Sequence, residues 1–419
     1  MAASPSASND PALRGAWLAA LLAFGVYLYR NGLVVWPYLF TTGGDFANYH
    51  RAAAAVLQGE SPFTCAAFDY PPLVALLMLP LASLPLDAAR VAWFLASHLC
   101  LLGAAALLWR PLGRDRAALL ALAALWALAG TVQENLALGQ IQPLLLLLLA
   151  FAFREDSGHP GRSAAALGLA AGLKVWPGLL LFADLEPRRL RALLFGLGIA
   201  ALAVALPLLT LLTCCAPPHL PTSTDYWMGT PAALNFSLPA LAVRLTYPVS
   251  ADSLLPADWQ AGNSPEGFHL APWRRGLSVA VSLATLAAGL LAISRVYRRR
   301  DRLYVLAALV ALATLASPIS WYHYQVFQLP GLALLGAAYS RRRAWWPLAG
   351  LAVLAAGLTR EEVRNFLWGS GETANVLATG AVVAALNVLL IVLLLRGMKG
   401  GEPGPPARAP IPLSEPGAS

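Results

Sequence analysis

Long apolar runs alternate along the chain with short polar stretches, and most of the basic residues fall in the polar stretches. A hydrocarbon core of about 30 Å is crossed by about 20 helical residues. Several runs approach or reach that length and are each expected to form a membrane-spanning helix: Trp17–Tyr38, Ala88–Trp109, Ala192–Thr213, Leu277–Val296 and Asn375–Leu395. The pattern therefore predicts an all-α, polytopic membrane protein.

Other apolar runs are too short to cross a bilayer alone. Leu73–Leu84 would extend only roughly 18 Å as a helix, and Pro80 and Pro85 interrupt it. We interpret it as a re-entrant or interfacial helix within a first external loop, residues 41–87. The remaining short runs are expected to be broken or tilted helices that surrounding protein shields: Ala117–Gly130, Pro143–Phe153, Ala164–Leu173, Pro177–Asp184, Leu303–Leu315, Gln325–Tyr339 and Trp345–Leu358.

The basic residues predict the topology, because cytoplasmic loops are enriched in Lys and Arg. With about twelve crossings, nearly every basic cluster falls on one side of the membrane. The exceptions are two pairs, Arg274 with Arg275 and Arg360 with Arg364. Both chain termini are then cytoplasmic in a cell membrane, and the opposite, external face is left for chemistry.

The same topology predicts a simple domain organisation. Residues 1–13 and the Pro/Gly-rich tail, residues 400–419, are expected to be disordered. Between them lies one membrane domain, residues 14–399, with a second external loop at residues 214–272.

Composition agrees with this class. The chain has 419 residues, of which 58% are hydrophobic and 12% charged, and its mean hydropathy is +0.62. Soluble domains carry roughly 25% charged residues, so a soluble protein is excluded. The formal net charge of +8 follows from membrane topology and does not require nucleic acid as a partner. Cys65 could pair with Cys214 or Cys215 on an oxidising side, or all could be free thiols.

The longest polar interruption in the N-terminal third, residues 41–72, contains the first candidate for chemistry. Asp45 follows an apolar run and should lie at the membrane–water boundary, where a carboxylate can act as a base. A helix is expected from Phe46 to Gln58, closed by Gly59. The alternative is that Asp45 only caps this helix.

Two further residues stand out as candidate cations. Lys174 interrupts an apolar stretch, which costs about 2.5–3.5 kcal/mol at the centre of a span, so such a residue usually is paired or lines a cavity. It could instead extend to the outer interface from a helix end. His323 lies between two apolar runs, within Ser317–Tyr324, where an aromatic interface belt is the alternative.

The predicted topology brings one set of polar residues to the external side or just below it. They are Asp45, Asn48, Tyr49, Gln140, Lys174, Asn235, Ser237, Ser320 and His323. No single motif places them together, so their common side is the argument for one shared site.

Six short motifs carry a resemblance, in the order Asp45 with Tyr49, Phe68–Leu73, Gly139-Gln140, Gly172–Lys174 with Pro177, Asn235–Pro239, and Ser317–His323. The chain resembles glycosyltransferase family 87 in this order, from about residue 41 to residue 330. That family includes mycobacterial polyprenyl-phosphomannose-dependent mannosyltransferases within the C-type membrane glycosyltransferases. The resemblance implies an acidic residue in the first external loop, short juxtamembrane helices after it, and a lipid-phosphate sugar donor.

The expected reaction is a single, inverting displacement that moves a sugar from a polyprenyl-phosphate donor to a hydroxyl of a glycolipid or glycan acceptor. Asp45 is the predicted catalytic base, and Lys174 and His323 are predicted to bind the donor phosphate. The predicted substrate-binding residues are Asn48, Tyr49, Tyr70, Gln140, Asn235, Ser237, Ser320 and Trp321. No Asp-x-Asp pair occurs in the first loop, so neither a metal nor a cofactor is expected.

The alternative function is a transporter or flippase of a lipid-linked or anionic solute. Broken helices and an intramembrane lysine occur in transporters too. However, no internal repeat relates the two halves, and the polar residues gather towards one face instead of the midplane. A scaffold without catalysis would leave Asp45, Lys174 and His323 without a purpose, so glycosyl transfer is preferred.

Overall fold

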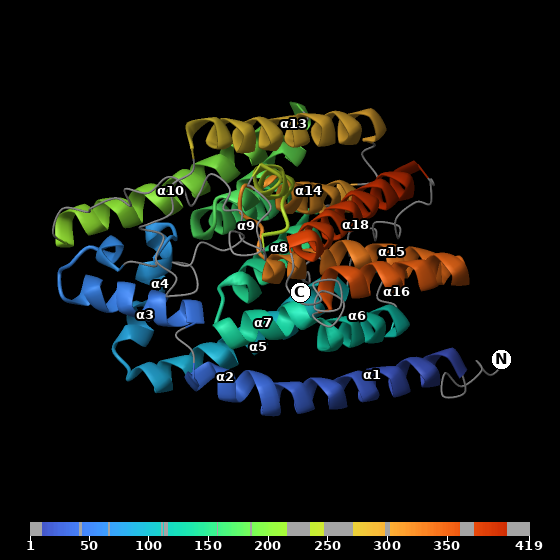
Figure 1. The fold of residues 1–419 in the computed structure, drawn as a ribbon, viewed down its shortest axis with the longest axis horizontal. Coiled ribbons are helices and arrows are strands. Elements are labelled where there is room, and N and C mark those ends of the chain that lie inside the picture. The colour runs from blue at the N-terminus through green and yellow to red at the C-terminus, as the bar shows by residue number, and fades with distance from the viewer. Residues whose placement is uncertain are drawn as a thin grey trace, which may run out of the picture.

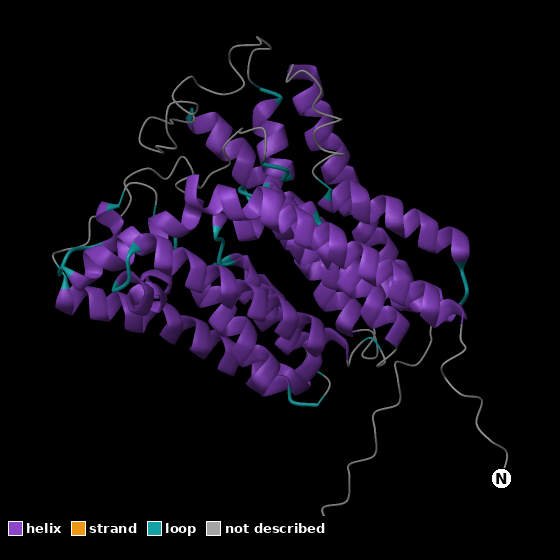
Figure 2. Ribbon diagram, turned by 90° about the horizontal axis from the view of Figure 1, so that it is seen from below, coloured by secondary structure: helices purple, strands orange, loops and turns teal. Residues whose placement is uncertain are grey.

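The computed structural model describes residues 11–41, 44–65, 68–109, 112, 116–156, 158–184, 187–215, 235–246, 271–297, 302–360 and 373–399. Within these ranges the chain is almost entirely helical, which confirms the all-α prediction, and there is no strand (Figure 2). Several predicted features lie outside the described residues. These are the N-terminus up to residue 10, Arg114, Arg299, most of the second external loop and the tail from residue 400.

The first part of the chain follows the predicted apolar pattern closely. The elements are α1 (Pro11–Arg30), a π-helical turn (Asn31–Val35), α2 (Trp36–Thr41), α3 (Gly44–Leu57), a 3-10 turn η3 (Pro62–Thr64), α4 (Pro72–Ala82) and α5 (Leu86–Trp109). The short helix predicted at Leu73–Leu84 is therefore present as α4. Its N-terminus carries Pro72, where a missing N–H costs nothing, and Pro80 lies inside it.

Most of the remaining elements also begin and end close to the predicted runs, but three short ones, at residues 130–138, 187–189 and 238–244, were not predicted. The remaining elements are α6 (Arg116–Leu128), α7 (Gly130–Leu138), α8 (Gln142–Glu155), α9 (Pro160–Leu173), η4 (Trp176–Asp184), η5 (Pro187–Arg189), α10 (Leu190–Cys214), α11 (Leu238–Arg244), α13 (Pro272–Val296), α14 (Arg302–Ala316), η10 (Tyr322–Gln328), α15 (Leu329–Arg341), α16 (Trp345–Thr359) and α18 (Thr373–Lys399). Here η4, η5 and η10 are 3-10 helices.

Five segments of the described chain are long and apolar enough to cross a membrane: Trp17–Leu57, Leu86–Trp109, Leu190–Cys214, Pro272–Val296 and Ala378–Gly397. Three apolar helices are shorter, namely α4, α14 and α16. The protein is thus a membrane protein by its helices, whereas the count of about twelve crossings stays a prediction.

The helices pack so that a short one lies inside and long ones lie outside (Figure 1). Almost every described side chain of α14 is buried. By contrast, α1, α10 and α13 expose large apolar side chains, among them Leu22, Leu194 and Leu283. A long helix with an apolar outer face suits contact with lipid, and protein shields the shorter helix.

Helices α3 and α4 and the start of α1 lie towards opposite ends of the long axis of the molecule (Figure 1). Helices α3 and α4 lie at one end, on the left in Figure 1, whereas α1 begins towards the opposite end. Because α1 carries the chain from one end to the other, α3 with Asp45 lies far from the start of the chain.

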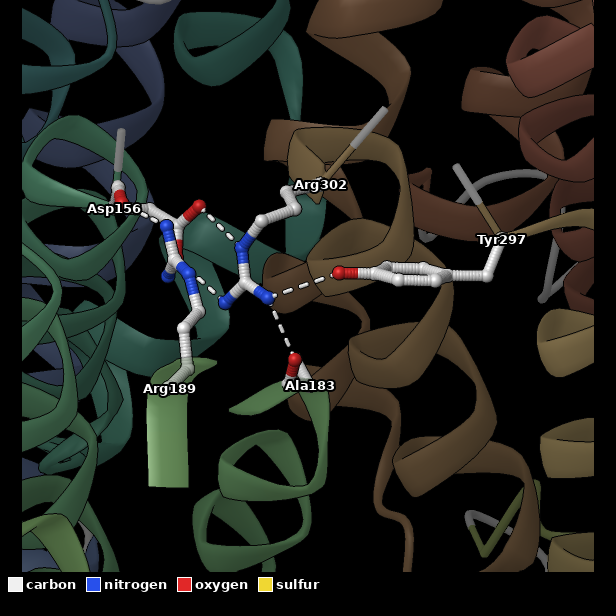
Figure 3. A network of polar contacts seen from close by, with 5 residues as sticks. All are labelled: Asp156, Ala183, Arg189, Tyr297 and Arg302. Atoms are coloured by element: carbon white, nitrogen blue, oxygen red, sulfur yellow. Dashed lines mark hydrogen bonds and ion pairs between the residues drawn. The ribbon is translucent and has the colours of Figure 1, made fainter. Parts of the chain in front are cut away.

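A buried ion-pair cluster joins α8, η5 and α14, and we call Asp156, Arg189 and Arg302 the Asp156 cluster (Figure 3). Arg302 donates from Nε and Nη2 to the two carboxylate oxygens of Asp156, at 2.7 and 2.8 Å. Arg189 donates to the same carboxylate at 2.9 Å. Arg302 also donates to the carbonyl of Ala183, at 2.6 Å, and to the hydroxyl oxygen of Tyr297, at 3.2 Å. The cluster therefore ties together segments that are 146 residues apart.

Candidate active site

Two glycines bring Asp45 against Gln140. Gly44 begins α3 with φ +47°, and Gly139 ends α7 with φ +64°, in the left-handed region that other residues avoid. A Cβ atom on Gly139 would lie 2.5 Å from the Cβ of Phe46, and one on Gly44 would lie 3.0 Å from the carbonyl oxygen of Leu138. The start of α3 and the end of α7 can therefore approach closely only because neither glycine has a side chain.

Gln140 is the centre of the resulting contacts. Its side-chain nitrogen donates to Oδ2 of Asp45. Its side-chain oxygen accepts from the hydroxyls of Tyr49 and Tyr70, each at 3.2 Å. The two tyrosine rings meet edge to face at 4.8 Å. Four of the predicted site residues thus lie together at one point between α3, α7 and the loop before α4.

Lys174 lies at the junction between α9 and η4. Its backbone is extended, with φ −156° and ψ 128°, and Pro177 follows, which removes an N–H that an α-helix would use. The ammonium lies 3.8 Å from the ring centroid of Tyr324 and 5.2 Å from that of Tyr70. Lys174 lies outside the five candidate spans. Burial lowers the pKa of its ammonium to about 7, and the negative charge of Asp45 acts in the opposite direction.

His323 is nearly buried in η10 and is held from α7. The side-chain nitrogen of Asn135 donates to its carbonyl at 2.8 Å, and a carboxylate oxygen of Glu134 lies 3.9 Å from its Nδ1. Its ring lies 4.9 Å from that of Tyr324, edge to face. These contacts fix the position of His323, and Tyr324 contacts both His323 and Lys174.

The contacts form a continuous series, which we call the Asp45–His323 cluster: Asp45, Gln140, Tyr70, Lys174, Tyr324 and His323. Nζ of Lys174 and Nε2 of His323 are buried and have no hydrogen-bond partner among the described residues. Buried polar groups are usually satisfied. An anion bound here would therefore meet two nitrogen donors, Nζ of Lys174 and Nε2 of His323, in a site that also holds the carboxylate of Asp45.

A second group of predicted residues supports the segment before His323. Oδ1 of Asn235 accepts from the backbone N–H of Ser320 at 2.9 Å, and its Nδ2 donates to the carbonyl of Pro318 at 2.9 Å. Asn235 and Trp321 form an isolated β-bridge. Ser237 caps α11 by accepting from the N–H of Ala240 at 3.1 Å. These residues hold residues 318–321 in place, and their predicted contact with substrate stays a prediction.

Asn48 is not joined to the Asp45–His323 cluster by any contact seen in the described part of the chain. Its side-chain oxygen accepts a hydrogen bond from Arg51, one turn further along the exposed face of α3. The structure therefore leaves Asn48 apart from both groups of predicted site residues in the part of the chain that it describes.

The described residues show neither a cluster of metal ligands nor a disulfide. Among the described residues no group of three or more His, Cys, Asp or Glu side chains could hold a metal ion, and the expected absence of a metal requirement stays a prediction. The four cysteines are free thiols.

Sequence reasoning missed Glu134, Asn135 and Asp69 as neighbours of the site. From the polar stretch around Glu134 the sequence analysis selects only Gln140 and its glycine, although an acidic residue between two apolar runs is itself a signal of function. Asp69 lies in the loop before α4, and burial together with the nearby charge of Asp45 raises its pKa to about 6. Its pairing in space with Asp45 could not be predicted from its position in the sequence.

Comparison with known proteins gives two kinds of match. The sequence model of glycosyltransferase family 87 matches residues 68–318. A polyprenol-phosphate-mannose-dependent α-(1-2)-phosphatidylinositol mannoside mannosyltransferase of Mycobacterium tuberculosis (strain ATCC 25618 / H37Rv) is 28% identical over 318 residues, which are 68% of this chain and 67% of the relative. A polyprenol-phosphate-mannose-dependent α-(1-2)-phosphatidylinositol pentamannoside mannosyltransferase of Mycobacterium tuberculosis (strain CDC 1551 / Oshkosh) is 24% identical over 361 residues, covering 82% of this chain and 77% of the relative.

Proposed function

The chain belongs to glycosyltransferase family 87, and we propose that it transfers mannose from polyprenyl-phosphate mannose to a hydroxyl of a glycolipid. It is a membrane glycosyltransferase by its family and its apolar helices. The names of the two relatives support the donor and the class of acceptor. The observation that carries the proposal is the Asp45–His323 cluster, because it joins a carboxylate to a lysine and a histidine through unbroken contacts.

The proposed mechanism is a single displacement with inversion at the anomeric carbon. Asp45 accepts the proton of the acceptor hydroxyl as that oxygen attacks the anomeric carbon. The bond from the anomeric carbon to the phosphate oxygen breaks, and the polyprenyl phosphate leaves with the electron pair. Lys174 and His323 stabilise the charge that develops on this phosphate, as fixed cationic groups do best where water is scarce.

The remaining predicted residues take supporting roles in this proposal. Gln140, Tyr49 and Tyr70 orient Asp45 through the hydrogen bonds described above. Asn235, Ser237, Ser320 and Trp321 hold the segment that carries His323, and Asn48 on the exposed face of α3 is left for the acceptor.

We further propose that about twelve helical segments cross the membrane within residues 14–399, with both termini cytoplasmic. The cluster then faces outward, near the edge of the bilayer, where a phosphate on a long lipid tail can reach it. The position of α3 and α4 at the end of the long axis opposite the start of α1 supports this sidedness (Figure 1).

The test is an assay with purified protein in detergent, radiolabelled polyprenyl-phosphate mannose and a set of mannosylated glycolipids. We expect a labelled glycolipid whose new linkage, determined by NMR, has the opposite anomeric configuration to the donor. A flippase would make no product in detergent, because there is no second compartment. Absence of transfer from any polyprenyl-phosphate sugar would contradict the proposal.

Sidedness is tested separately by cysteine labelling from outside intact cells. In a background without the native cysteines, we expect labelling of a cysteine introduced at the exposed position of Gln58, in the first external loop, but not at position 299. The reverse pattern would overturn the proposed orientation and would not affect the proposed reaction.

A further inference from the structure

The ammonium group of Lys174 lies against two aromatic rings. Its Nζ is 3.8 Å from the ring centroid of Tyr324 and 5.2 Å from that of Tyr70. Both values lie within the range in which a ring face attracts a cation. Because Nζ has no hydrogen-bond partner among the described residues, these rings are the direct contacts that the structure gives it, and the charge of Asp45 acts on it without an ion pair.

A ring face stabilises an ammonium group in a different way from a carboxylate. A carboxylate in direct contact would neutralise the positive charge and accept hydrogen bonds from its N–H groups. A tyrosine ring carries no net charge and attracts the cation through its quadrupole. Lys174 therefore keeps both its net charge and its N–H donors for an incoming anion.

Both rings are fixed before any ligand arrives. The hydroxyl of Tyr70 donates to Gln140 at 3.2 Å. Tyr324 is buried and its ring meets those of His323 and Phe327, at 4.9 and 6.5 Å. The rings are therefore held by their own contacts and do not depend on Lys174 for their positions.

We propose that Tyr324 and Tyr70 are positioning residues that keep the ammonium of Lys174 charged and directed towards the phosphate of the sugar donor. This inference rests on the proposed function for the identity of the anion. Tyr324 supplies the larger effect because its ring is nearer. Tyr70 also connects Lys174 to Asp45 through Gln140, so it belongs to both ends of the site.

The sequence offers a direct measurement of this ammonium group. Of the 29 Lys and Arg residues in the chain, only Lys174 and Lys399 are lysines. An amine-reactive reagent modifies the uncharged amine, so the rate of labelling at Lys174 against pH gives the midpoint of its titration. Mass spectrometry of the two lysine-containing peptides measures the rate of labelling at Lys174 relative to that at Lys399, and it needs no substrate.

The decisive pair of variants is Tyr324→Phe, which keeps the ring, and Tyr324→Leu, which replaces it by an aliphatic group. We expect the labelling midpoint of Lys174 to fall by about one pH unit in Tyr324→Leu, a tenfold change, and to stay unchanged in Tyr324→Phe. The other charged or titratable groups of the site are the same in both variants, namely Asp45, Asp69, Tyr70, Glu134 and His323. A wild-type midpoint in Tyr324→Leu would overturn the role of the ring. An equal fall in both variants would overturn it too.

Donor binding gives the second measurement. Inhibition of transfer by polyprenyl phosphate should weaken about tenfold in Tyr324→Leu and by less than about twofold in Tyr324→Phe, with kcat changed less than the donor KM. In a Lys174→Met background the substitution Tyr324→Leu should have no further effect on this inhibition. An equal loss in both backgrounds would mean that Tyr324 acts only on the fold, which would overturn the proposal.

Substitutions at Tyr70 separate the effect of its hydroxyl, which bonds to Gln140, from the effect of its ring, which lies near Lys174. Tyr70→Phe keeps the ring but removes the hydrogen bond to Gln140, so kcat should fall while the donor KM changes little. Tyr70→Leu should in addition lower the labelling midpoint of Lys174. If the wild-type protein transfers no sugar from any polyprenyl-phosphate donor, the proposed function fails, whereas the labelling experiment still decides the role of the rings.

Discussion

The Asp156 cluster and the Asp45–His323 cluster are both buried and charged, but their hydrogen bonding is opposite. In the Asp156 cluster one carboxylate receives two arginines, and Arg302 also donates to a carbonyl and to a tyrosine hydroxyl oxygen (Figure 3). In the Asp45–His323 cluster, Nζ of Lys174 and Nε2 of His323 have no hydrogen-bond partner among the described residues. The first arrangement has its donors satisfied by the protein, and the second leaves two buried nitrogen atoms for the ligand that we propose.

This difference separates stability from function. A buried charge that is paired and hydrogen-bonded on all sides fixes the segments that supply it, and removal of one partner is costly. A buried ammonium with ring contacts alone is destabilising for the folded state, but it is ready to bind an anion. The same bundle therefore uses its ionisable residues for two purposes at two places.

The sharpest test of the comparison is the carboxylate of each cluster, and Asp45 should give the largest kinetic effect. Asp45→Asn keeps the size of the side chain but removes the base, so transfer should fall by about 10²–10⁴-fold. Donor affinity should change much less. The rate of transfer and the donor KM of the purified variant provide the measurement, with exposed Asp87→Asn as the matched control. Retention of full activity would make Asp45 a helix cap.

Asp156→Asn should give the opposite result. The substitution leaves Arg302 and Arg189 buried without their counter-charge, which typically costs about 3–5 kcal/mol of folding free energy. The midpoint of thermal unfolding in detergent should drop clearly, while kcat of the protein that remains folded should stay near the wild-type value. Asp87→Asn removes an exposed ion pair and should cost only about 0–1 kcal/mol. A large loss of kcat without loss of stability would break the comparison.

Lys174→Met tests whether the ammonium of Lys174 serves donor binding or the stability of the fold. Loss of charge-assisted hydrogen bonds to the phosphate, each about 1.5–3 kcal/mol, should raise the donor KM by about 10–100-fold. Because the variant no longer buries a charge without a hydrogen-bond partner, its thermal unfolding midpoint should be equal to or above that of the wild type. A lowered midpoint with an unchanged donor KM would place Lys174 with the Asp156 cluster as a structural residue.

The pH dependence should give the smallest effect. The pKa of Lys174 is lowered to about 7, so the ammonium is present below that pH and lost above it. The value of kcat/KM for the donor, which reports the free enzyme, should therefore fall by about tenfold per pH unit above about pH 7. Lys174→Arg should abolish this decrease of kcat/KM at high pH, since a guanidinium stays charged. If kcat/KM still decreases above about pH 7 in the arginine variant, the decrease is caused by another titratable group.

The positions of the helices were largely predictable from the sequence, because their ends are marked by residues with local effects. The run predicted at Leu73–Leu84 forms α4, and the expected break at Lys174 lies between α9 and η4. The π-helical turn at Asn31–Val35 was not predictable, because it depends on how α1 packs and on a local hydrogen bond from Asn31 to the carbonyl of Tyr27.

The sequence predicted that several of these polar residues would share one region of the molecule, but it did not predict their contacts. Asp45, Lys174 and His323 stood out because charged and titratable residues are rare between apolar runs. The partners that orient them come from distant segments, such as Asn135, which lies 188 residues from His323. The pairing of Asp156 with Arg302 was missed for the same reason. Charge counting placed arginines on one side of the membrane and could not say which of them would be buried.

The amide of Gln140 also imposes a direction on proton transfer. Its oxygen receives the hydroxyls of Tyr49 and Tyr70, and this fixes which way round the amide lies, with its nitrogen towards Asp45. Oδ2 of Asp45 must then act as an acceptor and cannot carry a proton towards Gln140. In the proposed reaction Oδ1 is therefore the oxygen that has no hydrogen bond to Gln140, and the proton of the acceptor hydroxyl reaches it without competition from the amide. The two tyrosines thus favour one oxygen of the base over the other, although neither needs to touch the substrate.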